Sequence, residues 1–160
     1  MKDDSIKIFF QRISKKGVFD LNKVVKNLKD YLKDHKYFLN EKQNISKATD
    51  KGNEITLDFI AEKEIDDFYA YKITVDFLVT NLNKVSVKEK KLDKGEVEIR
   101  ITPRLILDHN NKFRGWLGDF LFKLYKSYVI KDKINKVYTA KLYVEAMGLF
   151  DLMKHDMDLY

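Results

Sequence analysis

The residues best suited to chemistry stand close together just before position 70. Glu62, Glu64, Asp66 and Asp67 bring four carboxylates into a short stretch, and oxygen-rich clusters of this kind can hold magnesium or calcium. Their spacing lacks the Asx-x-Asx-x-Asx-Gly order and distal glutamate of a calcium loop. Asp side chains also bond readily to nearby backbone in turns. The Asp66-Asp67 pair therefore predicts a turn between two strands rather than a metal or acid–base site.

Histidines supply no second site. His35, His109 and His155 are far apart in the sequence, and the chain has no cysteine. A zinc site needs about four ligands in tetrahedral geometry, and no two of these histidines stand three or four residues apart. We expect structural or solvent-exposed roles for them, and no metal site.

The sequence also lacks the motifs of a catalytic nucleophile and of a phosphate-binding loop. The serines lack the G-x-S-x-G elbow of hydrolases. The stretch RGWLGD at 114–119 has two glycines, but it lacks the Lys-Ser/Thr of a P-loop and the G-x-G-x-x-G order. Its simplest role is the start of a helix with Trp116 anchored in the core. The sequence predicts no catalytic residue and no cofactor, which favours a protein that is not an enzyme.

The first element that must position these residues is a helix after residue 20. Apolar residues recur there at i, i+3, i+4 and i+7, and Asp20 is a good N-cap. We expect this amphipathic helix within 18–38 and a short strand within 6–13, closed by Gly17. The apolar stripe of the helix is Leu21, Val24, Val25, Leu28 and Leu32.

The middle of the chain changes to a period of two. Apolar and polar residues alternate over 55–61, 69–79 and 97–107, with a shorter run at 85–87, which indicates strands with one buried face. Residues 40–53 are polar and predict a connection that ends in a DKGN turn at 50–53. A second turn is expected at DKG, 93–95, and an end at DHNN, 108–111. Pro103 cannot donate to a ladder, so it predicts an edge or a bulge.

Two further helices complete the pattern. Leu117, Phe120, Leu121, Leu124 and Tyr128 form one stripe, and a last helix runs toward Met153 with Ile134, Val137, Tyr138, Leu142, Ala146 and Leu149 on its apolar side. We expect a single α+β domain over 1–160. Its antiparallel meander of about five strands is covered by an N-terminal amphipathic helix and two C-terminal helices.

The stretches FDLNKVVKNLKDYLKDHKYFLNEK, at 19–42, and KGEVEIRI, at 94–101, resemble a group of small Lys- and Glu-rich uncharacterised archaeal or archaeal-virus proteins. The resemblance implies an archaeal setting and carries no activity or site residue. A curved meander capped by a long C-terminal helix is also similar to the helix-grip lipid-binding domains, which is an analogy of fold.

Composition sets the remaining expectations. The chain has 160 residues and a net charge of +6, with the excess positive charge toward its two ends. The absence of cysteine fits a reducing compartment. The first residues lack the apolar core of a signal peptide, and no run approaches the roughly 20 apolar residues of a membrane span. A cytoplasmic protein is expected.

Basic residues raise the possibility of an anionic partner. Lys26, Lys29, Lys33 and Lys36 are expected on one face of the first long helix, where they could track phosphates. The hairpin KVSVKEKKLDKGE at 84–96 could do the same. However, acidic residues such as Asp58 and Asp76 share the polar side of the sheet, so binding of nucleic acid or of a ribonucleoprotein is the alternative interpretation.

Aromatic residues near 120 carry the leading hypothesis. In WLGDFLFKLYKSYVI, the apolar residues exceed one narrow stripe, which is typical of a helix that is sandwiched in a core or contacts a second chain. We expect a non-enzymatic binding or assembly module that contacts a protein partner or a second copy. Its predicted interface is Trp116, Phe122, Tyr125 and Val129. A carrier of small hydrophobic ligands with a helix-grip-like cavity is a further alternative.

Overall fold

The computed structural model describes residues 5–110, 115–128 and 137–158. These residues form an antiparallel sheet with the strand order β1-β6-β5-β4-β3, in which β2 also pairs with β6. The six strands are β1 (Ser5–Lys7), β2 (Gln11–Phe19), β3 (Phe38–Thr49), β4 (Gly52–Glu64), β5 (Tyr69–Val87) and β6 (Lys90–Leu107). The last four follow one another as an antiparallel meander, which is the arrangement expected, although its strands are not the four that the alternation predicts.

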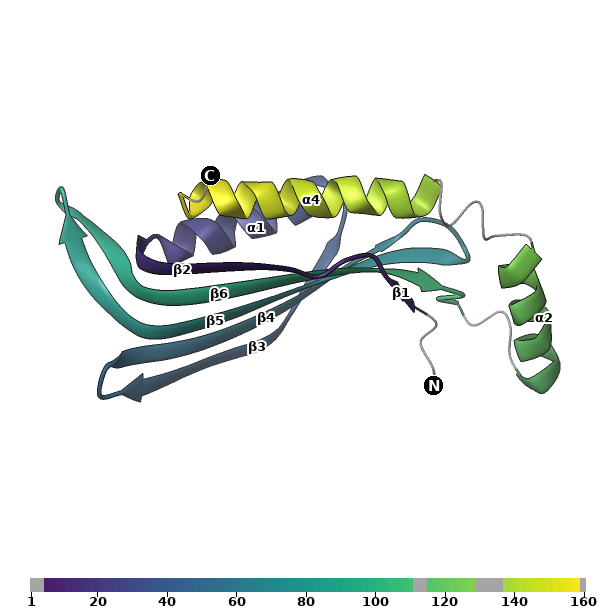
Figure 1. The fold of residues 1–160 in the computed structure, drawn as a ribbon, viewed down its shortest axis with the longest axis horizontal. Helices are drawn as coiled ribbons and strands as arrows, with labels where there is room; N and C mark the ends of the chain where they lie inside the picture. The colour runs from purple at the N-terminus through teal and green to yellow at the C-terminus, as the bar shows by residue number, and fades with distance from the viewer. Residues whose placement is uncertain (1–4, 111–114, 129–136, 159–160) are drawn as a thin grey trace.

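Of the helices that the structure describes, two cover one face of this sheet and one lies apart. α1 (Leu21–Asp34) and α4 (Thr139–Asp156) lie side by side on that face, whereas α2 (Gly115–Tyr128) lies at one end of the long axis of the molecule (Figure 1). The α+β class and the antiparallel sheet are confirmed. The expected arrangement of the helices is wrong, because α1 follows two strands and α2 does not cover the sheet.

Local signals explain how α1 begins and ends. Its N-cap Asp20 accepts a hydrogen bond from the backbone N–H of Lys23 at 3.1 Å. The buried Asp93 of β6 accepts another from the N–H of Leu21 at 3.0 Å. Both carboxylates satisfy N–H groups that have no partner inside the helix and complement its dipole. The helix ends before Lys36, which has a φ of 67°.

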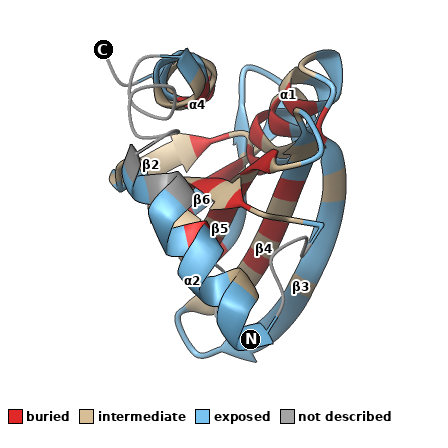
Figure 2. Ribbon diagram, turned by 90° about the vertical axis from the view of Figure 1, so that its right-hand side faces the viewer, coloured by how far each residue is buried: buried red, intermediate tan, exposed pale blue. Residues whose placement is uncertain are grey.

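The core lies between this helical layer and the sheet (Figure 2). Leu28 and Leu32 of α1 and Leu142 and Leu149 of α4 are fully buried, and each contributes roughly 1.5–3 kcal/mol through burial. The sheet side of the core consists of inward-facing residues such as Phe59, Tyr71, Ile73, Phe77, Ile99 and Ile101. Tyr71 faces inward, as its place in the alternation predicts.

Several strand boundaries differ from the sequence prediction. The N-terminal strand is divided into β1 and β2, and β2 continues through Gly17 to Phe19. Residues 38–49 form strand β3 rather than a polar connection, because an edge strand exposes most of its side chains and needs few apolar ones. The run at 85–87 continues β5, and the turn lies at Lys88 and Glu89 instead of 93–95.

Pro103 lies inside β6, not on an edge strand, and it pairs with Ile73 of β5. Its carbonyl accepts a hydrogen bond from the N–H of Ile8 at 3.0 Å on the opposite side. Its nitrogen faces the same side as its carbonyl, toward the gap between β1 and β2. The missing donor therefore falls where the ladder is already interrupted.

Candidate functional site

The carboxylate cluster before residue 70 forms the corner between β4 and β5. Asp66 accepts hydrogen bonds from the backbone N–H groups of Phe68 and Tyr69, at 2.8 and 2.7 Å, and from the hydroxyl of Tyr138 at 3.0 Å. Burial alone would raise the pKa of the Asp66 carboxyl. These hydrogen bonds and the nearby His109 nevertheless leave its pKa below the ordinary value. The predicted turn is confirmed.

Of the three histidines, His109 alone lies at this corner, and the three do not converge on one another. His109 contacts the backbone carbonyl of Asp66 through its ring, and His35 stacks on Tyr31 with ring centroids 4.1 Å apart. His155 lies 3.9 Å from a carboxylate oxygen of Asp156. Within the described parts of the chain, no three His, Asp or Glu side chains are placed to hold a metal ion.

A buried polar network that the sequence reading missed joins β4 to both covering helices. Lys63 Nζ donates to the two carboxylate oxygens of Glu145, at 2.9 and 3.2 Å, and to the carbonyl of His35 at 3.0 Å. The Tyr37 hydroxyl donates to the Glu145 carboxylate at 2.6 Å, and the Tyr31 hydroxyl donates to the Glu145 backbone carbonyl at 2.7 Å. The signal was available, because alternation from Phe59 and Ala61 places Lys63 on the inward face.

The electrostatics of this network favour a structural role. Burial, reinforced by the Glu145 carboxylate, raises the pKa of Tyr37 and raises that of Tyr71 to about 12. Both hydroxyls therefore stay protonated near neutral pH and act as donors. Lys63 and Glu145 are only 14% and 11% exposed. Because each charge already has internal partners, the network fixes α4 on the sheet and offers no open position to a substrate.

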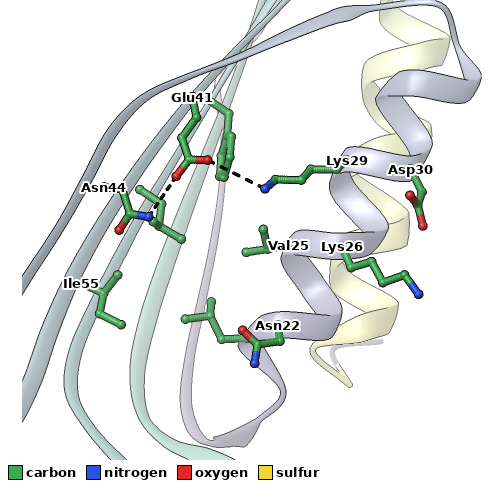
Figure 3. A pocket seen from close by; sticks show the side chains of 11 residues that line it. Asn22, Val25, Lys26, Lys29, Asp30, Glu41, Asn44 and Ile55 are labelled. Atoms are coloured by element: carbon green, nitrogen blue, oxygen red, sulfur yellow. Dashed lines mark hydrogen bonds and ion pairs between the residues drawn. The ribbon is translucent and has the colours of Figure 1, made fainter.

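A groove runs between α1 and the outer strands β3 and β4 (Figure 3). Its volume is about 540 Å³. Lys29 and Glu41 face one another across it at 3.8 Å, and Asn44 donates to Glu41 at 3.0 Å. The Lys29 ammonium also lies over the ring of Phe59, 5.5 Å from its centroid.

This groove does not suit the predicted hydrophobic-ligand carrier. The apolar residues Leu21, Leu57 and Phe59 on its floor are already buried by the chain itself. Only Val25 and Ile55 remain half-buried among the charged and amide side chains of its wall. A carrier site is lined mostly by apolar side chains, whereas this groove presents mixed charge to solvent.

The predicted lysine face of α1 is also mixed in charge. Lys26, Lys29 and Lys33 are exposed on the helix, but Lys36 lies beyond its end. The exposed carboxylates Asp30 and Asp34 alternate with these lysines, and Lys29 pairs with Glu41. A continuous phosphate-tracking stripe would lack this opposing charge.

Helix α2 shows the largest departure from expectation, because its apolar stripe points into solvent. Trp116 is 83% exposed and Phe120 is 56% exposed, while Phe122 is buried at 6%. The ring of Phe122 packs on that of Phe68, with centroids 5.9 Å apart. The prediction that Trp116 is anchored in the core is therefore wrong. Phe122, a predicted interface residue, faces the protein body.

The exposed residues of α2 form a continuous arc. At about 100° per residue, Trp116, Phe120, Leu124, Leu117 and Leu121 spread over roughly 140° of the helix circumference, and all five are exposed. Phe122 lies about 170° from the middle of this arc. Of the other predicted interface residues, the side chain of Tyr125 and the whole of Val129 lie outside what the structure describes.

Comparison with known proteins assigns no role to this arc. No protein-family model matches the chain, and no curated protein matches it. The archaeal resemblance stays a prediction. No helix in the described ranges is both long and apolar enough to cross a bilayer. The site must therefore be interpreted from its own geometry.

Proposed function

We propose that the chain is a non-enzymatic binding module and that α2 docks it onto an apolar surface outside the chain. The supporting observation is the outward arc of Trp116, Leu117, Phe120, Leu121 and Leu124. A surface helix normally turns its apolar stripe toward its own core, and a contiguous exposed apolar patch marks an interaction site.

The rest of the described structure supports this choice over catalysis. The carboxylate of Asp66 is engaged by a turn, and the Lys63–Glu145 pair is enclosed by its own partners. Neither set leaves a reactive group facing a cavity, which a catalytic constellation requires. Docking through a protein partner, or through a second copy of the chain, is the use that the sequence predicts for this part of the molecule.

Cysteine accessibility tests the docking role without assuming a partner. Because the chain has no cysteine, single replacements such as Leu117→Cys, Phe120→Cys and Leu121→Cys can be labelled cleanly with a maleimide. We expect these positions to react several-fold more slowly in the native host than in purified protein. Val144→Cys, at an exposed apolar position of α4, is the matched control and should react equally in both.

The pattern around the helix decides the outcome. Asp119 lies outside the apolar arc at about 60° from Trp116, so Asp119→Cys should be protected less than the arc positions. Equal reactivity of the arc positions in the host and in purified protein would show that nothing covers α2, and the docking role would then be wrong.

A further inference from the structure

The stretch of sequence that contains α2 has a large net positive charge. The stretch from Lys112 to Lys136 contains seven basic and two acidic residues and carries a net charge of +5. The whole chain carries +6, and residues 1–50, with twelve basic and seven acidic residues, form the other positive part of the sequence. An apolar arc within a strongly positive stretch is complementary to a surface that has an outer layer of negative charge and an apolar layer below it.

The dimensions of α2 restrict how it could meet such a surface. Its 14 residues extend over about 21 Å at 1.5 Å per residue, which is short of the roughly 30 Å hydrocarbon core of a bilayer. The described part of the helix therefore fits an orientation along the surface. Helices with Trp, Phe and Leu on one side and lysine beside them lie in this way at membrane interfaces, and Trp is favoured at that depth.

We propose that α2 lies in the interface of an anionic lipid bilayer, with its apolar arc in the headgroup–acyl boundary. The inference rests on the proposed docking role of α2 and names its partner. Phe122 holds the opposite side of the helix against Phe68, so the sheet and its two covering helices stay outside the bilayer. The protein thereby becomes a peripheral membrane protein.

The geometry favours a bilayer over a protein surface as the partner. The arc belongs to a single convex helix at the end of the molecule (Figure 1), and a fluid bilayer accommodates a convex helix without a shaped complement. A second copy of the chain would bring two segments of charge +5 together, which is unfavourable. Anionic lipid instead attracts each basic residue, by about fivefold in binding for each one near the surface.

The single tryptophan of the chain reports directly on this helix. The test mixes the full chain with vesicles of phosphatidylcholine, with and without phosphatidylserine, at low salt, and records Trp116 emission. We expect a blue shift with the anionic vesicles only, and reversal of that shift by added NaCl as the attraction is screened.

Variants separate insertion of α2 from adsorption through other basic surfaces. Phe120→Glu should weaken vesicle binding by roughly tenfold to a hundredfold, because a buried Phe side chain becomes a charge. Lys123→Gln should weaken it about fivefold. The matched control is Val144→Glu, which replaces an exposed apolar residue of α4 and should bind like wild type.

Three results would overturn the lipid inference. They are no blue shift with anionic vesicles, equal binding by Phe120→Glu, and a blue shift that grows with protein concentration in the absence of lipid. The last result, if abolished by Phe120→Glu, would make a second copy the partner and leave the docking role of α2 standing. Cysteine protection in the host judges that role separately, so the two failures are distinguishable.

Discussion

Lys63 and Glu145 show how a single inward-facing charge organises its surroundings. Strand alternation directs the Lys63 side chain toward the helices, where it is only 14% exposed, so its ammonium needs a carboxylate partner. Glu145 supplies that partner from α4 at 2.9 Å. The position of Lys63 could be predicted from the period of two, but its partner could not, because the two residues meet only after the sheet and α4 have packed.

Removing one member of this pair should be costly. Glu145→Leu leaves the Lys63 ammonium buried without its partner, and we expect a loss of about 3–5 kcal/mol in the free energy of unfolding. The double variant Lys63→Met/Glu145→Leu should regain at least half of that loss, since both charges are gone. Urea unfolding measures both. The exposed Lys141→Met on the same helix is the control and should change stability by less than about 0.5 kcal/mol.

Asp76 lies on the uncovered face of the sheet, and it makes the free energy of unfolding depend on pH. It lies directly across from Asp58 and from Arg100. Burial first, and the Asp58 carboxylate second, raise its pKa above the ordinary 3.8, against the opposing effect of Arg100. The folded state therefore binds this proton more tightly than the unfolded chain. The resulting stabilisation is present below pH 3.8 and is lost as pH rises through the raised pKa.

Asp76→Asn should consequently be more stable than wild type at pH 7, and the difference should shrink as the pH is lowered toward 3.8. Arg100 keeps a partner in this variant, because its Nε lies 2.6 Å from a carboxylate oxygen of Glu98. Thermal unfolding at a series of pH values is the measurement. A variant that is less stable than wild type at pH 7 would show that Arg100, not Asp58, dominates the surroundings of Asp76.

The contact between α1 and α4 depends on a glycine. A Cβ on Gly148 would meet the hydroxyl oxygen of Tyr31 at less than van der Waals distance, and that hydroxyl donates to the backbone carbonyl of Glu145. In an unobstructed helix, Gly→Ala stabilises by about 1 kcal/mol. Here we expect Gly148→Ala to destabilise by about 1–3 kcal/mol because of overpacking.

A double variant isolates the cause. In a Tyr31→Phe background the hydroxyl is absent. The nearest ring atom of residue 31, Cζ, lies 3.4 Å from the position that the new Cβ would occupy. Gly148→Ala should then cost nothing further in chemical unfolding. An equal loss in both backgrounds would mean that the clash with Tyr31 is not what makes glycine necessary at this position.

Helix α2 shows the limit of prediction from an apolar pattern. The stripe through Leu117, Phe120 and Leu124 correctly indicates a helix, which the structure describes from Gly115 to Tyr128. The pattern cannot say what covers the stripe. That depends on the space that α1 and α4 leave, and they already occupy the covered face of the sheet. α2 therefore turns its apolar stripe toward solvent, and Phe122 alone among its described apolar side chains is buried.

Across the whole molecule, the sequence correctly predicts the helices and strands that bury one face and expose the other. The stripe from Leu21 to Leu32 and the alternation from Tyr69 to Val79 match α1 and β5 because each buries one face. The prediction failed for β3, whose residues are mostly exposed at the edge of the sheet. It also failed to place the hairpin turn, because Lys88 and Glu89 adopt positive φ without the Asn or Gly typical of such turns.

The distribution of charge and apolar surface makes α2 the distinct end of the molecule. α2 and its exposed arc belong to the positive stretch of sequence from 112 to 136, whereas Lys29 of the groove pairs with Glu41, and Lys63 pairs with Glu145. The docking role and the lipid inference therefore depend on one property of the isolated chain, which is that the arc of α2 is not covered by the chain's own residues.

Acrylamide quenching of Trp116 in dilute purified protein, at a concentration where light scattering shows a monomer, tests that property most directly. With the side chain 83% exposed, we predict red-shifted emission and quenching close to that of free tryptophan, unchanged in Val144→Glu. Blue-shifted emission that resists the quencher in the monomer would contradict the docking role, because α2 would then pack its apolar arc against its own chain.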